Sequence, residues 1–429
     1  MNDPALVRGV GLAVPLVLLV ALCAHRRPTS REVAAMLTAT AWAALALLPL
    51  NLAAPSLGWW AFDAVGAVWL GLPLDLWLAW ALLWGAVPAL ALRHLSPLLV
   101  GALLVWVDLA LMPLGEPVVL LGARWDGGRH WIVGEAVAVM VALVPALALA
   151  RWTRSRRRTL LRGWAQAVAA GGLMLGLPVA VLVAASGTLP PRGVLGTGAQ
   201  LALAAALPGL AAMRELAVVG RGTPLPFDPP SRLVTSGPYA YLRNPMQAAV
   251  AGTYVVAAGT LAEPCLLLGA VVTVVYSAGL ADWHEDRALR GAFGEAWLGY
   301  RTAVRPWLPR WRPWPGRPRA TVYVAGDCDL CSGVGAWLLA RSPVALTVRP
   351  AAEHPEVLFR MTYEAPGVRT EGVAAFARAV EHAHLGWALA GWALSLPGVR
   401  HLAQLCADAF GAGPRPSCAG ELSGVSPGR

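Results

Sequence analysis

Long apolar stretches separated by short polar loops fill the first two thirds of the chain. Nine of them approach the length that a helix needs to cross about 30 Å of hydrocarbon. They lie near residues 9–24, 33–53, 65–92, 95–113, 131–150, 164–186, 196–213, 246–262 and 264–281. This pattern predicts a polytopic α-helical membrane protein with about nine spans.

Basic residues alternate from loop to loop along this region. Arginines follow the first, third, fifth and seventh spans, and the densest group is "RWTRSRRRTLLR", from Arg151 to Arg162. Because arginine-rich loops stay on the cytoplasmic side, we expect a cytoplasmic-membrane protein with its N-terminus outside and its C-terminus inside. The arginine group is interpreted as a topology determinant, with lipid-headgroup or nucleic-acid recognition as the alternative. No nucleic-acid partner is expected.

The long apolar stretches end at Ala281, and the mean hydropathy falls sharply after it. Residues 311–319 are rich in Pro, Arg and Trp and are predicted to be a linker at the membrane surface. From residue 320 the sequence has a run of β-branched residues, then a helical pattern, then a second β-branched run. This order predicts a small cytosolic α/β domain over 320–429. We divide the membrane part into two domains. The first, residues 1–160, consists of helices without an assigned role, and the second comprises residues 161–310.

Composition agrees with a membrane protein. Hydrophobic residues make up 57% of the chain and charged residues 14%, against about a quarter charged in soluble domains. Apart from one C-x-x-C, the six cysteines are scattered along the chain, so no disulfide framework of a secreted domain is visible. Asp75 and Asp108 stand within apolar spans and are functional candidates, because a carboxylate inside a membrane is costly.

A rigid turn, "GPYAYLRNPMQ" at residues 237–247, precedes the eighth predicted span. Asn244 is expected to cap the new helix and Pro245 suits its first position, but capping does not explain Arg243. The eighth and ninth spans form a helical hairpin, which returns its two ends to one side. We therefore expect Arg243 to meet the acidic pair Glu285 and Asp286 at one membrane face.

This combination suits a ligand with an α-carboxylate and an α-ammonium. A guanidinium binds a carboxylate with two parallel hydrogen bonds, and an acidic pair holds an ammonium. S-adenosylmethionine is such a ligand, and its sulfonium favours aromatic faces, for which the candidates are Tyr239, Tyr241 and Trp283. The alternative for Arg243 with Glu285 is an interfacial salt bridge between two helix ends.

The turn, together with the later "HEDRALRGAFGEAWLGYRTAVRPWLPR", resembles the catalytic region of the isoprenylcysteine carboxyl methyltransferase and phospholipid methyltransferase family. The resemblance covers about residues 196–310. It implies S-adenosylmethionine-dependent methyl transfer to a lipidic or prenyl-cysteine-like acceptor at the cytoplasmic membrane face. It also implies that the turn residues and the acidic pair bind the cofactor; these are Arg243, Asn244, Pro245, Glu285 and Asp286. Gln247 stands where the family has Tyr.

The C-x-x-C lies in "GDCDLC", with Cys328 at a predicted strand end and Cys331 in the first turn of a helix. A helix N-terminus stabilises a thiolate, so Cys328 is the expected nucleophile and Cys331 the resolving partner. Residues 320–410 resemble the DCC family of thiol-disulfide oxidoreductases, which implies a thioredoxin-like domain and a thiol partner. Ala325 stands where that family has Asp. A relic fold without redox activity and metal binding are the alternatives, although no second ligand pair completes a metal site.

The sequence thus predicts a membrane methyltransferase fused to a cytosolic thioredoxin-like domain. Two other functions stay open. One is a membrane-anchored thiol-disulfide oxidoreductase that acts through Cys328 and Cys331. The other is a noncatalytic transport or scaffold protein that is sensitive to changes at Asp108.

Overall fold

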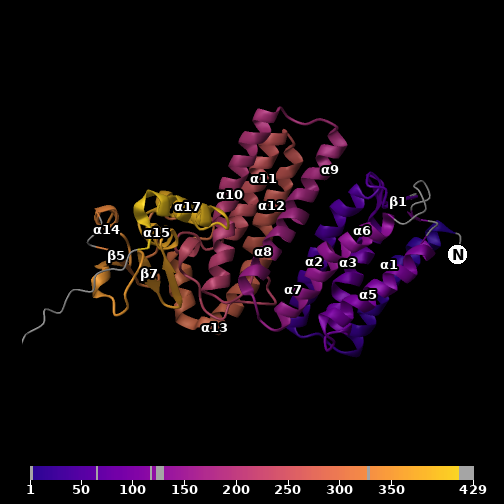
Figure 1. The fold of residues 1–429 in the computed structure, drawn as a ribbon, viewed down its shortest axis with the longest axis horizontal. Helices are drawn as coiled ribbons and strands as arrows, with labels where there is room; N and C mark the ends of the chain where they lie inside the picture. The colour runs from indigo at the N-terminus through magenta and orange to yellow at the C-terminus, as the bar shows by residue number, and fades with distance from the viewer. Residues whose placement is uncertain (1–2, 64–65, 116–117, 122–129, 326–328, 415–429) are drawn as a thin grey trace, which may run out of the picture. The chain divides into compact units, whose positions relative to one another are not determined.

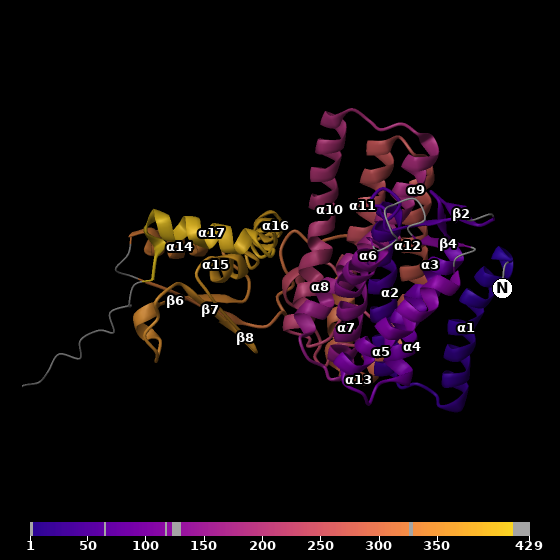
Figure 2. The same ribbon diagram turned by 45° about the vertical axis from the view of Figure 1, so that its right-hand side comes forward.

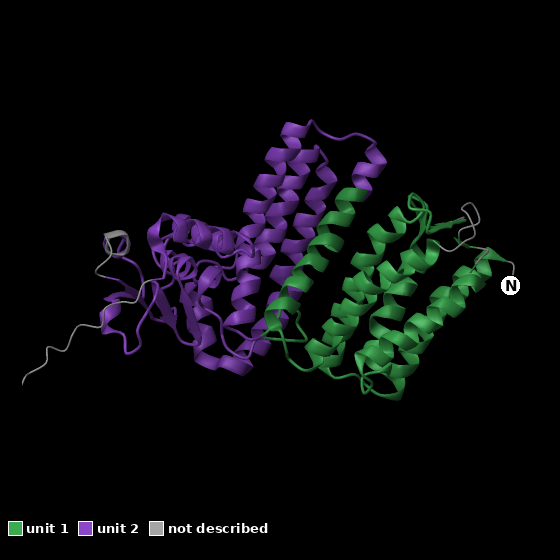
Figure 3. Ribbon diagram, viewed as in Figure 1, with its two compact units in different colours: residues 1–180, 222–229 green, residues 181–221, 230–429 purple. Residues whose placement is uncertain are grey.

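The computed structural model describes residues 3–63, 66–115, 118–121, 130–325 and 329–414, and for 329–332 it describes the backbone alone (Figure 1). The chain divides into two compact units (Figure 3). The first consists of Met1–Ala180 and Gly222–Pro229, and the second of Val181–Arg221 and Pro230–Arg429. Each unit is described by itself.

The first unit is a bundle of membrane helices around α2. Its helices are α1 (Pro4–His25), α2 (Ser30–Ala53), α3 (Leu74–Trp84), α4 (Ala86–Ala91), α5 (Pro97–Leu111), α6 (His130–Ala138), α7 (Val144–Arg154) and α8 (Thr159–Ala170). A π-helical turn at Val139–Leu143 joins α6 to α7. Short antiparallel pairs join β1 (Trp60–Phe62) to β4 (Val119–Leu121) and β2 (Val68–Trp69) to β3 (Leu72–Pro73).

Small residues let the helices of this unit approach closely. Ala35, Ala39 and Ala43 on α2 are buried in the core, as is usual where helices pack in a membrane. Gly85, between α3 and α4, lies directly against the backbone of α2, because a Cβ built there would lie 2.5 Å from the Thr40 Cα. The sequence therefore needs glycine at this position for packing.

The membrane part of the second unit is a series of consecutive helices. These are the end of α9 (Leu177–Ser186), α10 (Arg192–Val218), α11 (Pro245–Leu261), α12 (Leu267–Tyr276) and α13 (Asp282–Ala303), with a π-helical turn at Ser277–Ala281 between the last two (Figure 1). α10 packs along α11, and α11 packs along α12 (Figure 2). Gly198 on α10 lets the Thr260 side chain of α11 lie where a Cβ would be, at 2.3 Å.

The described residues contain eight helices that are long and apolar enough to cross a membrane, against the nine that we expected. The difference is α11, whose 17 residues make it shorter than each of these eight. The expected hairpin is present, since only a short turn with the 3-10 helix η6 (Pro264–Leu266) separates α11 from α12.

The C-terminal region contains a four-stranded sheet of order β6-β5-β7-β8. β5 (Ala320–Val324) and β6 (Leu346–Pro350) are parallel and are connected through α14 (Asp329–Leu339), whereas β7 (Thr362–Ala365) and β8 (Val368–Glu371) form an antiparallel hairpin beside β5. α15 (Val373–Val380), α16 (Leu385–Leu394) and α17 (Val399–Ala407) follow. The small sheet-containing region predicted from the sequence is confirmed.

We predict that Gly85→Ala lowers the free energy of unfolding by about 1–3 kcal/mol, because the added methyl group overpacks the contact with α2. Thermal unfolding of the detergent-purified chain measures the loss. The control is Gly101→Ala, where the nearest atom to an added Cβ is Leu147 Cδ1 at 3.8 Å. Equal melting temperatures for the two variants would contradict this packing.

Candidate active site

The predicted turn is held in place by the chain that follows α13. It consists of the 3-10 helix η5 (Gly237–Ala240) and the residues leading to Pro245, the first residue of α11 as expected. Backbone hydrogen bonds fix it, among them those from Arg243 N to Arg305 O at 2.9 Å, from Arg310 N to Tyr241 O at 2.9 Å and from Trp314 N to Ala240 O at 2.8 Å. The turn is therefore pre-organised by main-chain bonds.

Gly237 is required by this geometry. Its φ is +57°, a value that other residues rarely adopt, and a Cβ there would lie 3.1 Å from the Glu215 side chain of α10. Asn244 does not cap α11 with its side chain, so that expectation is wrong. Its φ and ψ of −114° and 58° differ from those of an ordinary cap, and its backbone N–H donates to Pro306 O at 3.3 Å.

Arg243 reaches the first turn of α13, as the hairpin predicted, but its partner is Asp282. The Nη2–Oδ1 distance is 3.3 Å, and Nη1 donates to Arg301 O at 3.3 Å. Asp282 also pairs with Arg301 at 3.1 Å. The Nε of Arg243 is buried and has no hydrogen-bond partner in the part of the chain that the structure describes. This guanidinium is thus held firmly and keeps one donor unused.

The acidic pair splits into two different environments. Asp286 accepts a hydrogen bond from Trp297 Nε1 at 2.8 Å and pairs with Arg290 at 3.0 Å and with Arg301. Glu285 is exposed and makes no hydrogen bond or ion pair with any described residue. An interfacial salt bridge between Arg243 and Glu285 is therefore not formed, and Glu285 keeps a free carboxylate next to the Arg243–Asp282 pair.

Asp282 is a site residue that the sequence analysis missed. The signal was present, because Asp282 stands three residues before Glu285, and residues three apart share one face of a helix.

The three aromatic candidates differ in their access to a ligand. Tyr239 is buried beside Trp297, and Tyr300 donates a hydrogen bond to its carbonyl oxygen at 2.9 Å. Tyr241 is fully buried, and its hydroxyl donates to Glu381 O at 2.8 Å. Burial raises the pKa of both phenols, so they stay protonated at neutral pH. Of the candidates, Trp283 is the exposed one, with the Arg287 guanidinium over its ring at 4.3 Å.

A buried ionic network joins the turn to the C-terminal region. Glu215 of α10 pairs with Arg378 of α15 at 2.5 Å and accepts a hydrogen bond from Ser236. Arg378 also lies 3.6 Å from Glu381, whose carbonyl oxygen accepts a hydrogen bond from Arg317 at 2.7 Å. Arg317 belongs to the segment expected to be a linker. Burial acts to lower the pKa of Arg378, but the attraction of Glu215 and Glu381 raises it overall, so the guanidinium stays charged.

The structure describes the C-x-x-C motif only in part. Cys328 lies outside the described residues, and of Cys331 the backbone alone is described, in the first turn of α14. The expected order of strand, C-x-x-C and helix is present, since β5 ends at Val324 and α14 begins at Asp329. The redox roles of the two cysteines stay predictions.

Comparison with known proteins gives one finding. Residues 195–296 match the family model for phospholipid methyltransferase. The matched segment includes α10, the turn with Arg243, the α11–α12 hairpin and the first half of α13 with its carboxylates. It therefore points to a membrane methyltransferase and supports that part of the resemblance. No curated protein and no solved structure matches the chain. The resemblance of residues 320–410 to the DCC family stays a prediction.

We predict that Arg378→Met lowers the free energy of unfolding by about 3–5 kcal/mol, because Glu215 is left as an unpaired buried charge. Adding Glu215→Gln to this variant should recover part of the loss. The control is Arg369→Met, which removes an exposed ion pair with Glu356 and should change stability by about 1 kcal/mol or less. Chemical denaturation in detergent checks this, and equal losses for Arg378→Met and Arg369→Met would contradict the network.

Proposed function

We propose that this chain is a membrane methyltransferase of the isoprenylcysteine carboxyl methyltransferase type. It transfers a methyl group from S-adenosylmethionine to a lipidic or prenyl-cysteine-like acceptor at the cytoplasmic membrane face. The observation that carries the proposal is the position of Arg243, which has an unused buried donor beside the carboxylates of α13 within the segment that matches the methyltransferase family.

The residues present suit the two ends of the amino-acid part of this cofactor. Arg243 would bind the α-carboxylate with its free donor, while Asp282 holds the guanidinium in place. Glu285, exposed and without an ionic partner among the described residues, would hold the α-ammonium. Trp283 offers an exposed aromatic face to a sulfonium. When bound, S-adenosylmethionine supplies an electrophilic methyl group.

An apolar acceptor has a direct route to these residues. Large hydrophobic side chains are exposed along α12 and the π-helical turn that leads to Asp282; they are Val271, Val272, Val275, Tyr276 and Leu280. In a membrane such a surface faces lipid, so an acyl or prenyl chain would lie against α12 with its reactive group near α13. The protein's part in the reaction is then to align the acceptor and to exclude water.

The need for a base depends on the acceptor. A carboxylate acceptor is already deprotonated and needs none, whereas an amine or thiol has to lose a proton first. Asp282 and Asp286 already pair with arginines, and Glu285 is assigned to the α-ammonium, so these carboxylates favour an acceptor that needs no base.

The remaining sequence-based predictions are part of the same proposal. We place the N-terminus outside and the C-terminal domain in the cytoplasm, and we keep the domain borders 1–160, 161–310, 311–319 and 320–429. A parallel β5–α14–β6 unit followed by the β7–β8 hairpin and α15 supports a thioredoxin-like assignment for the last domain. A thiol-disulfide oxidoreductase and a noncatalytic transporter or scaffold gain no specific observation from the described residues.

The decisive experiment is calorimetric titration of S-adenosylmethionine into the detergent-purified chain. We expect saturable binding by the native protein and an affinity loss of about 10- to 100-fold in Arg243→Ala, since a charged hydrogen bond contributes about 1.5–3 kcal/mol. Glu285→Gln should weaken binding by about 10-fold. The control is Arg349→Ala, which removes an exposed arginine of β6. Absence of binding by the folded native chain, or native affinity in Arg243→Ala, would refute the proposal.

A further inference from the structure

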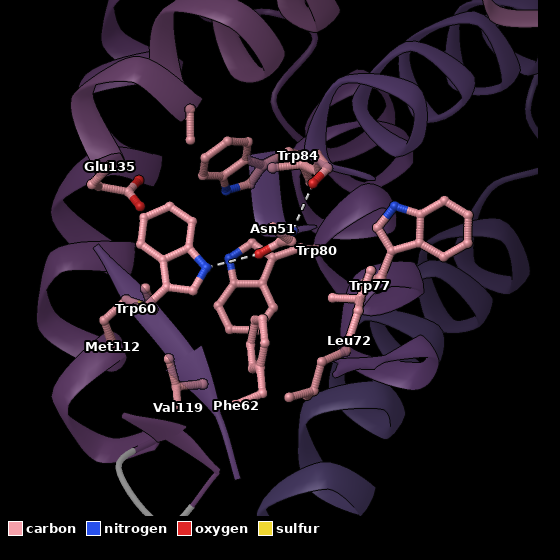
Figure 4. Close-up of a pocket in the computed structure, with 13 residues that line it drawn as sticks. Asn51, Trp60, Phe62, Leu72, Trp77, Trp80, Trp84, Met112, Val119 and Glu135 are labelled. Atoms are coloured by element: carbon pink, nitrogen blue, oxygen red, sulfur yellow. Dashed lines mark hydrogen bonds between the residues drawn. The ribbon is translucent and has the colours of Figure 1, made fainter. Parts of the chain in front are cut away.

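The first unit contains a small internal cavity that the methyl-transfer site does not use (Figure 4). Its volume is about 30 Å³, which suffices for one or two water molecules but not for an organic ligand. Most of the lining is aromatic or aliphatic, and the polar members are Asn51 of α2 and Glu135 of α6. The lining residues include Trp60, Phe62, Trp77, Trp80 and Trp84.

Two buried carboxyl groups lie in this part of the bundle: Glu135 lines the cavity, and Asp108 is hydrogen-bonded to the lining residue Trp80. Glu135 and Asp108 are 4% and 3% exposed, and the carboxyl group of each is close enough to perturb the other electrostatically. Trp80 Nε1 donates to Asp108 Oδ1 at 3.1 Å. The other oxygens, Asp108 Oδ2 and Glu135 Oε1, receive no N–H or O–H from any described residue, and the indole N–H of Trp84 is likewise buried and unpartnered.

No basic side chain balances this pair. Neither carboxyl group has an arginine or histidine partner among the described residues, and Glu135 is the sole titratable group of the cavity lining. The other intramembrane carboxylate predicted from the sequence, Asp75, is different, because Arg8 binds it through Nε and Nη2 at 2.8 and 2.9 Å. Among its described residues the same unit thus contains carboxylates that arginines neutralise, such as Asp75, and a carboxyl pair without a cation.

We infer that Asp108 and Glu135 form a proton-binding site in the N-terminal membrane unit. Two neighbouring negative charges in an apolar interior, with no basic partner among the described residues, are strongly unfavourable, so at least one of the two groups carries a proton. One proton shared by the two groups leaves the pair with a single negative charge, and a second proton makes it neutral.

The cavity gives this proton an exchange partner. Water in a space of this size would accept a hydrogen bond from Trp84 Nε1 and donate to Glu135 Oε1, which satisfies both unpartnered atoms. The N-terminal helices would then bind and release a proton independently of the residues proposed for methyl transfer. Glu135 was not singled out from the sequence, although a carboxylate within an apolar span was the signal.

Infrared difference spectroscopy of the full-length protein in lipid nanodiscs tests the inference. At pH 8, where exposed carboxyl groups are ionised, we expect the C=O stretching band of a protonated carboxyl group, with a shift to lower frequency in D₂O. The band should be lost in the double variant Asp108→Asn/Glu135→Gln and altered in each single variant. The matched control, Asp75→Asn, should leave it unchanged.

Three results would overturn the site. They are the absence of the band in the folded native protein, a band that persists in the double variant, and a band that disappears when potassium is replaced by sodium, which would make a metal cation the occupant. Because the first of these needs only the native chain, the test does not depend on the folding of a variant.

Discussion

The cost of burying charge determines where the polar side chains of this chain lie. An isolated ion in an apolar interior costs several kcal/mol, so it persists where a partner of opposite sign is in contact. In the first unit, Arg162 and Asp228 are almost fully buried and 2.6 Å apart. In the second, Glu215 and Arg378 come from segments 163 residues apart and form an equally buried pair. These pairs fix tertiary structure where alanine-rich apolar packing has little specificity.

At the end of the α11–α12 hairpin where Arg243 meets α13, the charged groups are not all paired. Asp282 and Asp286 are satisfied by arginines and by Trp297, whereas Arg243 Nε and the Glu285 carboxylate have no partner among the residues that the structure describes. The two unused groups have opposite charge, and both belong to the turn and helix that match the methyltransferase family. This arrangement of opposite charges is the basis of the proposed binding of a zwitterionic ligand.

The meeting of the turn with the start of α13 was predictable from the sequence, because it depends on local connectivity. The short turn after α11 dictates that both hairpin ends return to one side, so a meeting of Arg243 with the start of α13 follows from connectivity. The choice of Asp282 over Glu285 does not, because the π-helical turn at Ser277–Ala281 changes the angular position of every residue after it. The Glu215–Arg378 pair was not predictable either, since it depends on how α15 packs, which no local pattern specifies.

The buried ionic network links the C-terminal region directly to the turn. Tyr241 of the turn and Arg317 both donate to the carbonyl oxygen of Glu381, and Arg378 on the same helix holds Glu215 beside Gly237. Displacing the sheet-containing region would therefore break ion pairs and hydrogen bonds that no water replaces. This region consequently supports the turn as part of one folded unit.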